Sequence, residues 1–571
     1  MPPQTMNPSI QHTSSNPAFA RKAVGRTDYR PLILIMIIAL TLRILWMASN
    51  ATVISGEGAE YVRMAQNLAA GNGLRGNFQG PETMYAPFFP VLTVGLDLLI
   101  RDAELAAHII TLIFGTALIV PVFFIARRMY GDHVALLGAA LVAFHPLFIA
   151  LSGSIYNENV YIPLLLAGVY FGMSSLESRR NRDFVFLSVC LSLAYLCRPE
   201  AFAYPVFFVA ALWAGAVLGR VSRREAGRGS AVILVTFLLF AAPYIGFLYA
   251  KTGQVRLEGK WNINYTIGCR MRSGMSFTEA AFGLAPDATV AGPLLDPFRF
   301  ASQTPCPHSI AEKARTLLAT AKRNREVVFR LLRDSAFGGA LPLVLVVIGV
   351  FRKSWNQRRL FYEGIIVCMM ISVLFLNLTN PDVSFRYILP LLPFGVLWTA
   401  KGIEELGQWT RGLVCSIKGR LLPSPKWAGL FVEVIALLLI FDVALAGTRA
   451  NWFFLSERAD FADVKKAGIW LNKLSPGPKR IAAPTTIFTY YAQGTLVGLP
   501  FAESARTLRY VDSKNVDFIE VDSHFSSDSP EVADWVEHGI PDKRAQPIYE
   551  VGTSPNKKIT IYRWEKPVSS H

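Results

Sequence analysis

The sequence predicts an α-helical protein that crosses a membrane many times, and three observations support this fold class. Of the 571 residues, 52% are hydrophobic and only 17% are charged, and the mean hydropathy is +0.34. This composition is too apolar for an ordinary soluble domain. Apolar stretches of about 20 residues, enough to cross a bilayer, recur along the chain. Basic residues gather in alternate connecting segments, so the positive-inside rule explains the net charge of +16 better than nucleic-acid binding does.

Most of the predicted spans are long apolar stretches. They lie near 31–50, 104–126, 133–153, 159–176, 229–250, 336–351, 360–379, 385–402 and 427–449. Two shorter stretches between 183 and 219 flank the turn "CRPEA", which gives about 11 spans of bilayer-crossing length. The apolar stretch at 87–100 is short and carries Asp97, so we expect an interfacial helix there.

Charge sets the expected orientation of the spans. One side of the membrane collects the basic segments Arg21–Arg30, Arg127–Arg128, Arg179–Arg182, Arg220–Arg228, Arg352–Arg359 and Lys401–Lys426. The positive-inside rule makes this side cytoplasmic, together with the polar tail 1–30, which we read as preceding an uncleaved anchor. The first outer loop (51–103), a large outer loop (251–335) and residues 451–571 then lie outside. A crossing at 87–100 would move the later basic segments outside, so the rule rejects it.

The C-terminal segment 451–571 lacks long apolar runs and predicts a small extracytoplasmic α/β domain. "DVKKAGIWLNKLSP" predicts an amphipathic helix with Ala, Ile, Trp and Leu on one face. "RIAAPT" and "VDFIEVD" predict strands. Residues 31–450 then form the transmembrane domain.

The six cysteines include no CxxC pair, so we expect no structural zinc site. Cys269 and Cys306 both fall in the large outer loop, an oxidising environment if that loop is extracytoplasmic. We therefore predict that they pair, with two unpaired thiols as the alternative.

The stretch "SGEGAEYVRMAQNLAAGNG" at 55–73 places two carboxylates just after the first span. Ser55 is a suitable helix cap, and Glu57 falls in the first turn, where the helix dipole favours an ionised carboxylate. Such a group could accept a proton from an incoming hydroxyl; the alternative is a solvated helix cap. Glu57 shares a helix face with Tyr61, whereas Glu60 points about 60° away.

Three more polar clusters fall on the predicted outer side. In "SGSIYNENVY", Glu158 opens a span, either as a functional carboxylate or as a plain loop residue. In "YLCRPEAF", Arg198 between two spans needs an anion, which is either Glu200 or a bound phosphate. In "NPDVSFRYILPLLP", Arg386 opens an inward-going span, and snorkelling to the interface is its alternative.

These motifs resemble the C-type superfamily of polytopic membrane glycosyltransferases, in particular lipid A aminoarabinose transferases and protein O-mannosyltransferases. The matching positions in the first outer loop are Glu57, Tyr61, Ala65, "GNG" at 71–73 and "PFFP" at 87–90. Three departures stand out: Glu57 replaces the usual Asp, Gly58 replaces a frequent second acid, and "MYA" replaces a basic residue often found before the Pro-x-x-Pro. Further matches are "HPLFIALSGSIYNENVY", "LSLAYLCRPEAF", "RYILPLLP" and the soluble tail.

The resemblance implies the C-type fold and an enzyme that transfers a sugar, with inversion, from a polyprenyl-phosphate donor to a hydroxyl outside the membrane. The acceptor is a lipid, an envelope glycan or a protein, and the location is a bacterial inner membrane. Glu57 is the expected base, Glu158 assists, and Arg198 and Arg386 bind the donor phosphate. Further candidate contacts are Glu60, Tyr61, Arg75, Tyr85, Glu200 and Tyr387. We expect no cofactor, no nucleic-acid partner and no metal site. A requirement for a divalent metal ion is left as an alternative.

Two other classes of protein compete with this interpretation. A transporter or flippase of a polar lipid or lipid-linked sugar would also place charges near the outer membrane surface. The common transporter folds have paired repeats with broken helices, and the sequence has no such repeat. A non-catalytic scaffold would leave the four polar clusters unexplained.

Overall fold

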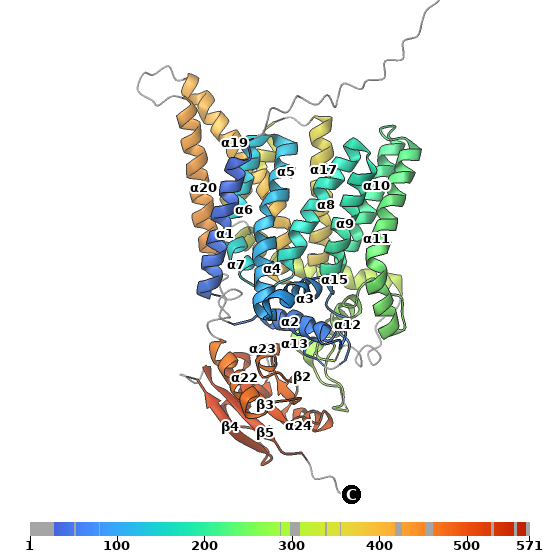
Figure 1. The fold of residues 1–571 in the computed structure, drawn as a ribbon, viewed down its shortest axis with the longest axis vertical. Helices are drawn as coiled ribbons and strands as arrows, with labels where there is room; N and C mark the ends of the chain where they lie inside the picture. The colour runs from blue at the N-terminus through green and yellow to red at the C-terminus, as the bar shows by residue number, and fades with distance from the viewer. Residues whose placement is uncertain are drawn as a thin grey trace, which may run out of the picture.

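The computed structural model shows a long helical bundle with a small sheet-containing domain against one end (Figure 1). It describes residues 28–50, 53–78, 80–285, 287–296, 309–336, 340–353, 356–416, 425–450, 461–526, 530–552 and 557–566. The bundle contains α1 (Arg30–Asn50), α4 (Ala103–Ala117), α5 (Ile119–Tyr130), α6 (Asp132–Phe144), α7 (Pro146–Ser152), α8 (Glu158–Ser178), α9 (Asn181–Cys197), η2 (Pro199–Phe202), α10 (Ala203–Val217), α11 (Arg223–Thr252), α16 (Ala340–Phe351), α17 (Gln357–Thr379), α18 (Phe385–Ile388), η4 (Leu389–Leu391), α19 (Leu392–Ser416) and α20 (Pro425–Ala450).

Six helices within the described residues are long and apolar enough to cross a membrane, or up to seven if the bent pair α6–α7 counts as one span. They are Arg30–Asn50, Ala103–Tyr130, Glu158–Ser178, Pro199–Val217, Arg223–Thr252 and Arg359–Thr379. Each overlaps a stretch that the sequence predicts as a span. α9 has 17 residues and α16 has 12, so they fall short by length. The structure therefore confirms a multi-pass helical fold, and the count of about 11 crossings stays a prediction.

The bent pair α6–α7 is held by a buried arginine. The two helices meet at an angle of 57°, so the last carbonyls of α6 lose their intrahelical partners. In a bilayer such groups need other partners. Arg43 of α1 is fully buried and donates to the carbonyls of Val142 (3.2 Å) and Ala143 (3.0 Å), and to Ser152 Oγ (3.1 Å). Arg43 therefore links α1 to the break between α6 and α7 and supplies hydrogen bonds to the carbonyls that the break leaves unpaired.

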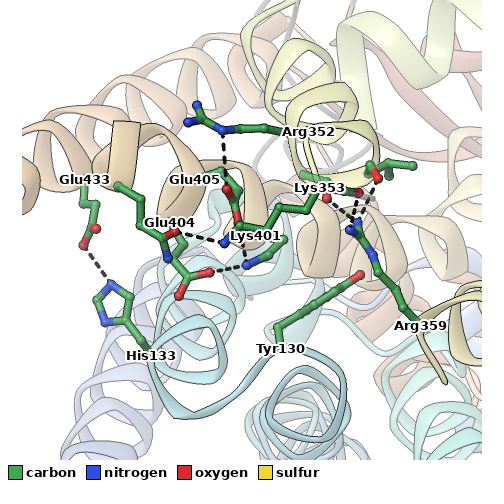
Figure 2. A network of polar contacts seen from close by, with 12 residues as sticks. Tyr130, His133, Arg352, Lys353, Arg359, Lys401, Glu404, Glu405 and Glu433 are labelled. Atoms are coloured by element: carbon green, nitrogen blue, oxygen red, sulfur yellow. Dashed lines mark hydrogen bonds and ion pairs between the residues drawn. The ribbon is translucent and has the colours of Figure 1, made fainter. Parts of the chain in front are cut away.

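A network of ion pairs ties the helices together at the end of the bundle where α17 begins (Figure 2). Buried Glu405 of α19 lies 2.8 Å from both Lys353 and Lys401. Arg359 of α17 donates to the last carbonyls of α16, and Glu433 of α20 lies 2.9 Å from His133 of α6. These contacts join α6, α16, α17, α19 and α20. We assign them a structural role, because buried carboxylates need such partners.

A second group of helices gathers at the opposite end of the bundle (Figure 1). They are α2 (Gly56–Ala69), α3 (Phe88–Ile100), α12 (Trp261–Arg272), α13 (Phe277–Phe282) and α15 (Ile310–Arg330), which continues into a π-helical turn, η3 (Leu331–Ala336). Ser55 caps α2 as the sequence predicts, since its hydroxyl accepts from the Gly58 amide. At 13 residues α3 is too short to cross a bilayer, and its end exposes Leu98 and Leu99.

The C-terminal part folds into an α/β domain around a five-stranded sheet of order β2-β1-β3-β5-β4. β1 pairs in parallel with β2 and β3, and β5 pairs antiparallel with β3 and β4. Its elements are α22 (Ala462–Leu474), β1 (Arg480–Ala483), α23 (Thr486–Tyr491), β2 (Thr495–Gly498), α24 (Ser504–Ser513), β3 (Phe518–Asp522), η5 (Ser523–Phe525), α25 (Pro530–His538), β4 (Ala545–Val551) and β5 (Ile559–Trp564). Both strands predicted from the sequence are present as β1 and β3.

The predicted apolar face of α22 is partly wrong. α22 buries Val464, Ala467 and Leu471, whereas Ile469 is exposed. Trp470 instead stacks on Tyr549 of β4, with ring centroids 4.3 Å apart. A long aromatic side chain can reach the edge of the sheet from outside the buried stripe, which helical periodicity alone does not reveal.

The α/β domain contacts the start of α2 directly. The Tyr491 hydroxyl accepts from the Ile54 amide (3.0 Å) and donates to Glu104 (3.0 Å). Thr486 Oγ1 donates to the Gly56 carbonyl (2.6 Å). The domain thereby fixes the helix turn that carries Glu57.

Candidate active site

Arg386 lies at the centre of a compact cluster of charged side chains. It is carried by the short helix α18, where the chain turns between α17 and α19. Its Nη1 lies 2.5 Å from Glu57 Oε2, and its Nη2 lies 3.0 Å from Glu158 Oε1. Its guanidinium also stacks over the Tyr156 ring at 4.2 Å. One arginine thus joins two carboxylates that are 101 residues apart in the sequence (158 minus 57).

Arg198 completes the cluster from the turn between α9 and α10. Its Nη1 lies 2.8 Å from Glu158 Oε1, and its Nε lies 2.5 Å from Glu200 Oε1. Its guanidinium also faces the rings of Tyr161 (5.6 Å) and Tyr387 (5.2 Å). Both arginines therefore bind the same oxygen of Glu158, and the two stacked rings restrict where the Arg198 guanidinium can turn.

Glu158 is fully buried, and it is the carboxylate that the two arginines share. Its Oε2 has no hydrogen-bond partner among the described residues. A buried carboxylate oxygen without a partner is costly and marks a position where a bound group could donate a hydrogen bond. The cluster is therefore charged, desolvated and incompletely satisfied.

Glu57 is ionised in this setting. Burial raises its pKa, but the charge and hydrogen bond of Arg386, followed by the charge of Lys260 and a hydrogen bond from Tyr61, lower it further, so the pKa lies below its ordinary value. The Tyr61 hydroxyl donates to Glu57 Oε1 at 3.0 Å. This is the i, i+4 contact along α2 that the sequence predicts.

Lys260 is a further cation of the cluster that the sequence reasoning missed. It lies at the start of α12, with Nζ 6.0 Å from the centroid of the Tyr387 ring. Tyr387 and then Glu57 raise the pKa of Lys260, and burial opposes them. A Cβ at Gly259 would come within 1.8 Å of the Thr83 carbonyl, so this glycine lets the segment that carries Lys260 approach the segment after α2. The sequence around it, "LEGKWN", matches none of the motifs that pointed to the other cluster residues.

Glu60 lies outside this cluster, although it is on the same helix as Glu57. Its carboxylate accepts from the Asn77 amide (2.9 Å) and from Asn77 Nδ2 (2.8 Å), and it interacts with Glu82. Burial, followed by the nearby charge of Glu60, raises the pKa of Glu82 to about 8. Glu82 in turn accepts from the amides of Met84 (2.6 Å) and Tyr85 (3.1 Å).

The structure separates the remaining candidate residues into two groups. Tyr85 packs edge-on against Tyr61 with ring centroids 5.4 Å apart, which brings it next to the cluster. Arg75 is exposed, and its carbonyl accepts from Asn67 Nδ2 at 2.8 Å. No contact described for Arg75 joins its guanidinium to the cluster.

The predicted disulfide stays a prediction. Cys269 on α12 is a free thiol in the structure, and Cys306 lies outside the described residues. Within the described residues, no group of three or more His, Cys, Asp and Glu side chains is arranged to hold a metal ion.

Known proteins with similar sequence and fold agree with the resemblance noted in the motifs. Residues 85–245 match a family model described as dolichyl-phosphate-mannose-protein mannosyltransferase. The fold is similar to an Archaeoglobus fulgidus oligosaccharyltransferase in its apo form (TM-score 0.60, 14% identity, 95% of this chain and 75% of that chain covered). The same oligosaccharyltransferase in complex with Zn and sulfate gives a TM-score of 0.59 at 14% identity, with 94% and 74% covered.

ArnT from Cupriavidus metallidurans bound to undecaprenyl phosphate is also similar, with a TM-score of 0.55 at 13% identity, covering 94% of this chain and 98% of that chain. No curated protein sequence matches this chain. At these identities the solved structures report on the fold, and the sequence match covers the segment from Tyr85 to Ile245. Together they show a match to this mannosyltransferase family over residues 85–245 and a fold similar to those of the oligosaccharyltransferase and ArnT, in agreement with the resemblance to C-type membrane glycosyltransferases.

Proposed function

We propose that this protein transfers a sugar from a polyprenyl-phosphate donor to a hydroxyl acceptor on the outer face of a bacterial inner membrane, with inversion at the anomeric carbon. The observation that carries the proposal is Arg386, which holds a candidate base, Glu57, and the shared carboxylate Glu158 within one ion-paired cluster. A lipid phosphate binding to Arg386 would therefore lie next to the base.

The donor phosphate is assigned to three cations. Arg198 and Arg386 present planar guanidinium groups, which suit phosphate oxygens, and Lys260 adds a third positive charge. In the structure the two arginines are paired with carboxylates, so the phosphate competes with Glu57 for Arg386 and with Glu158 for Arg198. ArnT was solved with undecaprenyl phosphate and Archaeoglobus AglB with a dolichol phosphate, which supports a lipid-phosphate donor.

The transfer step follows from this placement. As the phosphate binds Arg386, the Glu57 carboxylate is released from its partner and accepts the proton of the acceptor hydroxyl. The acceptor oxygen attacks the anomeric carbon on the side opposite the phosphate. The bond between the anomeric carbon and the phosphate oxygen breaks, and the polyprenyl phosphate leaves with the electron pair, its charge balanced by the three cations. Attack from the opposite side inverts the anomeric configuration.

The acceptor is a lipid, an envelope glycan or a protein, and the reaction faces the outside of the cell. The sidedness is supported by basic residues at the end of the bundle away from the cluster: Arg180 caps the end of α9 opposite Arg198, and Arg223 and Arg224 begin α11. Alkaline phosphatase fused after Ser475 of the α/β domain should be active, and the same reporter fused after Arg180 should be inactive. The reverse pattern would place the cluster in the cytoplasm.

The activity is tested with the full-length protein reconstituted with radiolabelled polyprenyl-phosphate sugars and a membrane extract that supplies acceptors. Label should move to a hydroxyl-bearing product whose anomeric configuration, read by NMR, is opposite to that of the donor. Label that crosses the bilayer on an unchanged donor would instead indicate a flippase. Retention of configuration would exclude the single-displacement step.

A further inference from the structure

Helix α15 carries an exposed stripe of basic and apolar side chains that the proposed reaction does not use. The stripe consists of Arg315, Leu318, Lys322, Arg325 and Phe329, spaced three and four residues apart and therefore on one face of the helix. Leu318 is 70% exposed and Phe329 is 60% exposed, and the three basic residues are exposed as well. Large apolar side chains so exposed beside basic ones call for a partner surface.

Another face of α15 is firmly attached to the bundle. Asn324 is buried, and its Nδ2 donates to the carbonyls of Leu378 (3.1 Å) and Asn380 (2.7 Å), at the end of α17. Arg323 donates to the Pro381 carbonyl (2.8 Å), and Thr316 accepts from Arg272 of α12 (2.7 Å). α15 is thus fixed at the end of α17, level with α3 and α12 (Figure 1).

The position of α15 puts its stripe at the membrane surface. α17 is one of the helices apolar enough to cross a bilayer, and it exposes Ile371 and Phe375 close to the end that α15 contacts. Exposed apolar residues on a spanning helix face lipid chains, so the hydrocarbon layer ends close to α15.

The composition of α15 is that of a helix lying in a lipid headgroup layer. Its sequence, IAEKARTLLATAKRNREVVFR, holds six basic and two acidic residues along with large apolar ones. Helices of this kind bury apolar side chains at the boundary of the acyl chains, while their Lys and Arg side chains bind anionic headgroups. The excess of positive charge matches an anionic phospholipid and not a zwitterionic one.

We propose that the α15 stripe binds anionic phospholipids of the leaflet next to the charged cluster, with Leu318 and Phe329 inserted among the acyl chains. Arg315, Lys322 and Arg325 contact the headgroup phosphates. Since Asn324 and Arg323 hold the segment that leads to Arg386, lipid binding also steadies the loop that carries the centre of the cluster.

The experiment places the photocrosslinker p-benzoylphenylalanine at Leu318, with Ala319 as the matched control position. Both residues are exposed, but Ala319 points about 100° away from the stripe. The full-length protein is inserted into nanodiscs of phosphatidylcholine and phosphatidylglycerol in equal amounts, irradiated and analysed by mass spectrometry. We expect phospholipid adducts at position 318, with phosphatidylglycerol in several-fold excess over phosphatidylcholine, and few lipid adducts at position 319.

A charge variant separates headgroup binding from simple immersion. Arg315→Gln, Lys322→Gln and Arg325→Gln together should bring the two lipids to equal yield at position 318. The control Arg180→Gln, Arg223→Gln and Arg224→Gln removes three exposed basic residues at the other end of the bundle and should leave the excess intact. No lipid adduct at 318, equal yields of the two lipids in the unaltered protein, or adducts with protein or glycan instead would each overturn the proposal. None of these readouts depends on sugar transfer.

Discussion

At the scale of single residues, the cluster separates the two carboxylates of α2 into different roles. Glu57 contacts Arg386 and Tyr61, whereas Glu60 is bound to Asn77. Glu57→Gln keeps the shape but removes the proton acceptor, so sugar transfer should fall about 10²–10⁴-fold, with donor binding retained. Glu57→Asp should keep partial activity, because it retains a carboxylate.

The matched control for this prediction is Glu60→Gln, measured with the same labelled donor. It changes a carboxylate on the same helix that does not touch Arg386, so the transfer rate should change little. Loss of transfer in Glu60→Gln together with normal transfer in Glu57→Gln would exchange the two roles. Normal transfer in both variants would mean that neither carboxylate is the base and that the start of α2 serves only as a helix cap.

Arg198 tests whether the cluster needs a planar cation. Its Nη1 and Nε bind Glu158 and Glu200, and its flat group lies over two tyrosine rings. A lysine has one nitrogen and cannot make both contacts, so Arg198→Lys should raise the donor KM about 10–100-fold, the equivalent of one charged hydrogen bond. Arg75→Lys, an exposed change away from the cluster, should leave KM unaltered. Normal transfer by Arg198→Lys at limiting donor would remove Arg198 from the phosphate site.

At the scale of elements, the stability of the loop after α2 depends on whether Glu82 is protonated. The raised pKa means that folded Glu82 keeps its proton up to about pH 8, whereas the ordinary value is 4.5. The folded state therefore binds more protons in this window, so this contribution to stability falls as pH rises from about 4.5 and is lost above about pH 8.

Glu82→Gln tests this pH dependence, because glutamine imitates the protonated acid and still accepts from the Met84 and Tyr85 amides. The unfolding temperature of the unaltered protein should drop relative to that of the variant between pH 6 and pH 9, as followed by scanning fluorimetry in detergent. A constant difference between the two proteins over that range would mean that Glu82 does not titrate there.

The elements also show how far the sequence could be read. Apolar runs of sufficient length identify spans, and helical spacing identifies the Glu57–Tyr61 contact, because both are local patterns. The partners of Arg43 at the α6–α7 break are about 100 residues away, and those of Arg386 lie in two different segments, around Glu57 and around Glu158. The convergence of the clusters followed from placing them on one side of the membrane. Their exact pairing, and the arrival of Lys260, depend on how loops pack, which no local pattern encodes.

At the scale of the whole molecule, the α/β domain is a support for the cluster as well as an appendage. Its helix α23 holds the start of α2 through Tyr491, which accepts from the Ile54 amide, and through Thr486. Ile54 is buried, so removing the Tyr491 hydroxyl leaves its amide without that partner, at a cost of about 1–3 kcal/mol. A change at this contact is transmitted to the charged cluster, because Glu57 lies in the first turn of α2.

Tyr491→Phe should therefore loosen the start of α2 and slow transfer at saturating donor several-fold, while donor binding through Arg198 persists. Hydrogen exchange followed by mass spectrometry should show faster exchange over residues 53–60. The control Tyr549→Phe alters a ring that stacks on Trp470 within the same domain, and it should change neither exchange at α2 nor transfer. Unchanged exchange over residues 53–60 in Tyr491→Phe would show that α2 holds its position without the domain, and Ser55 and the bundle would then be sufficient to position Glu57.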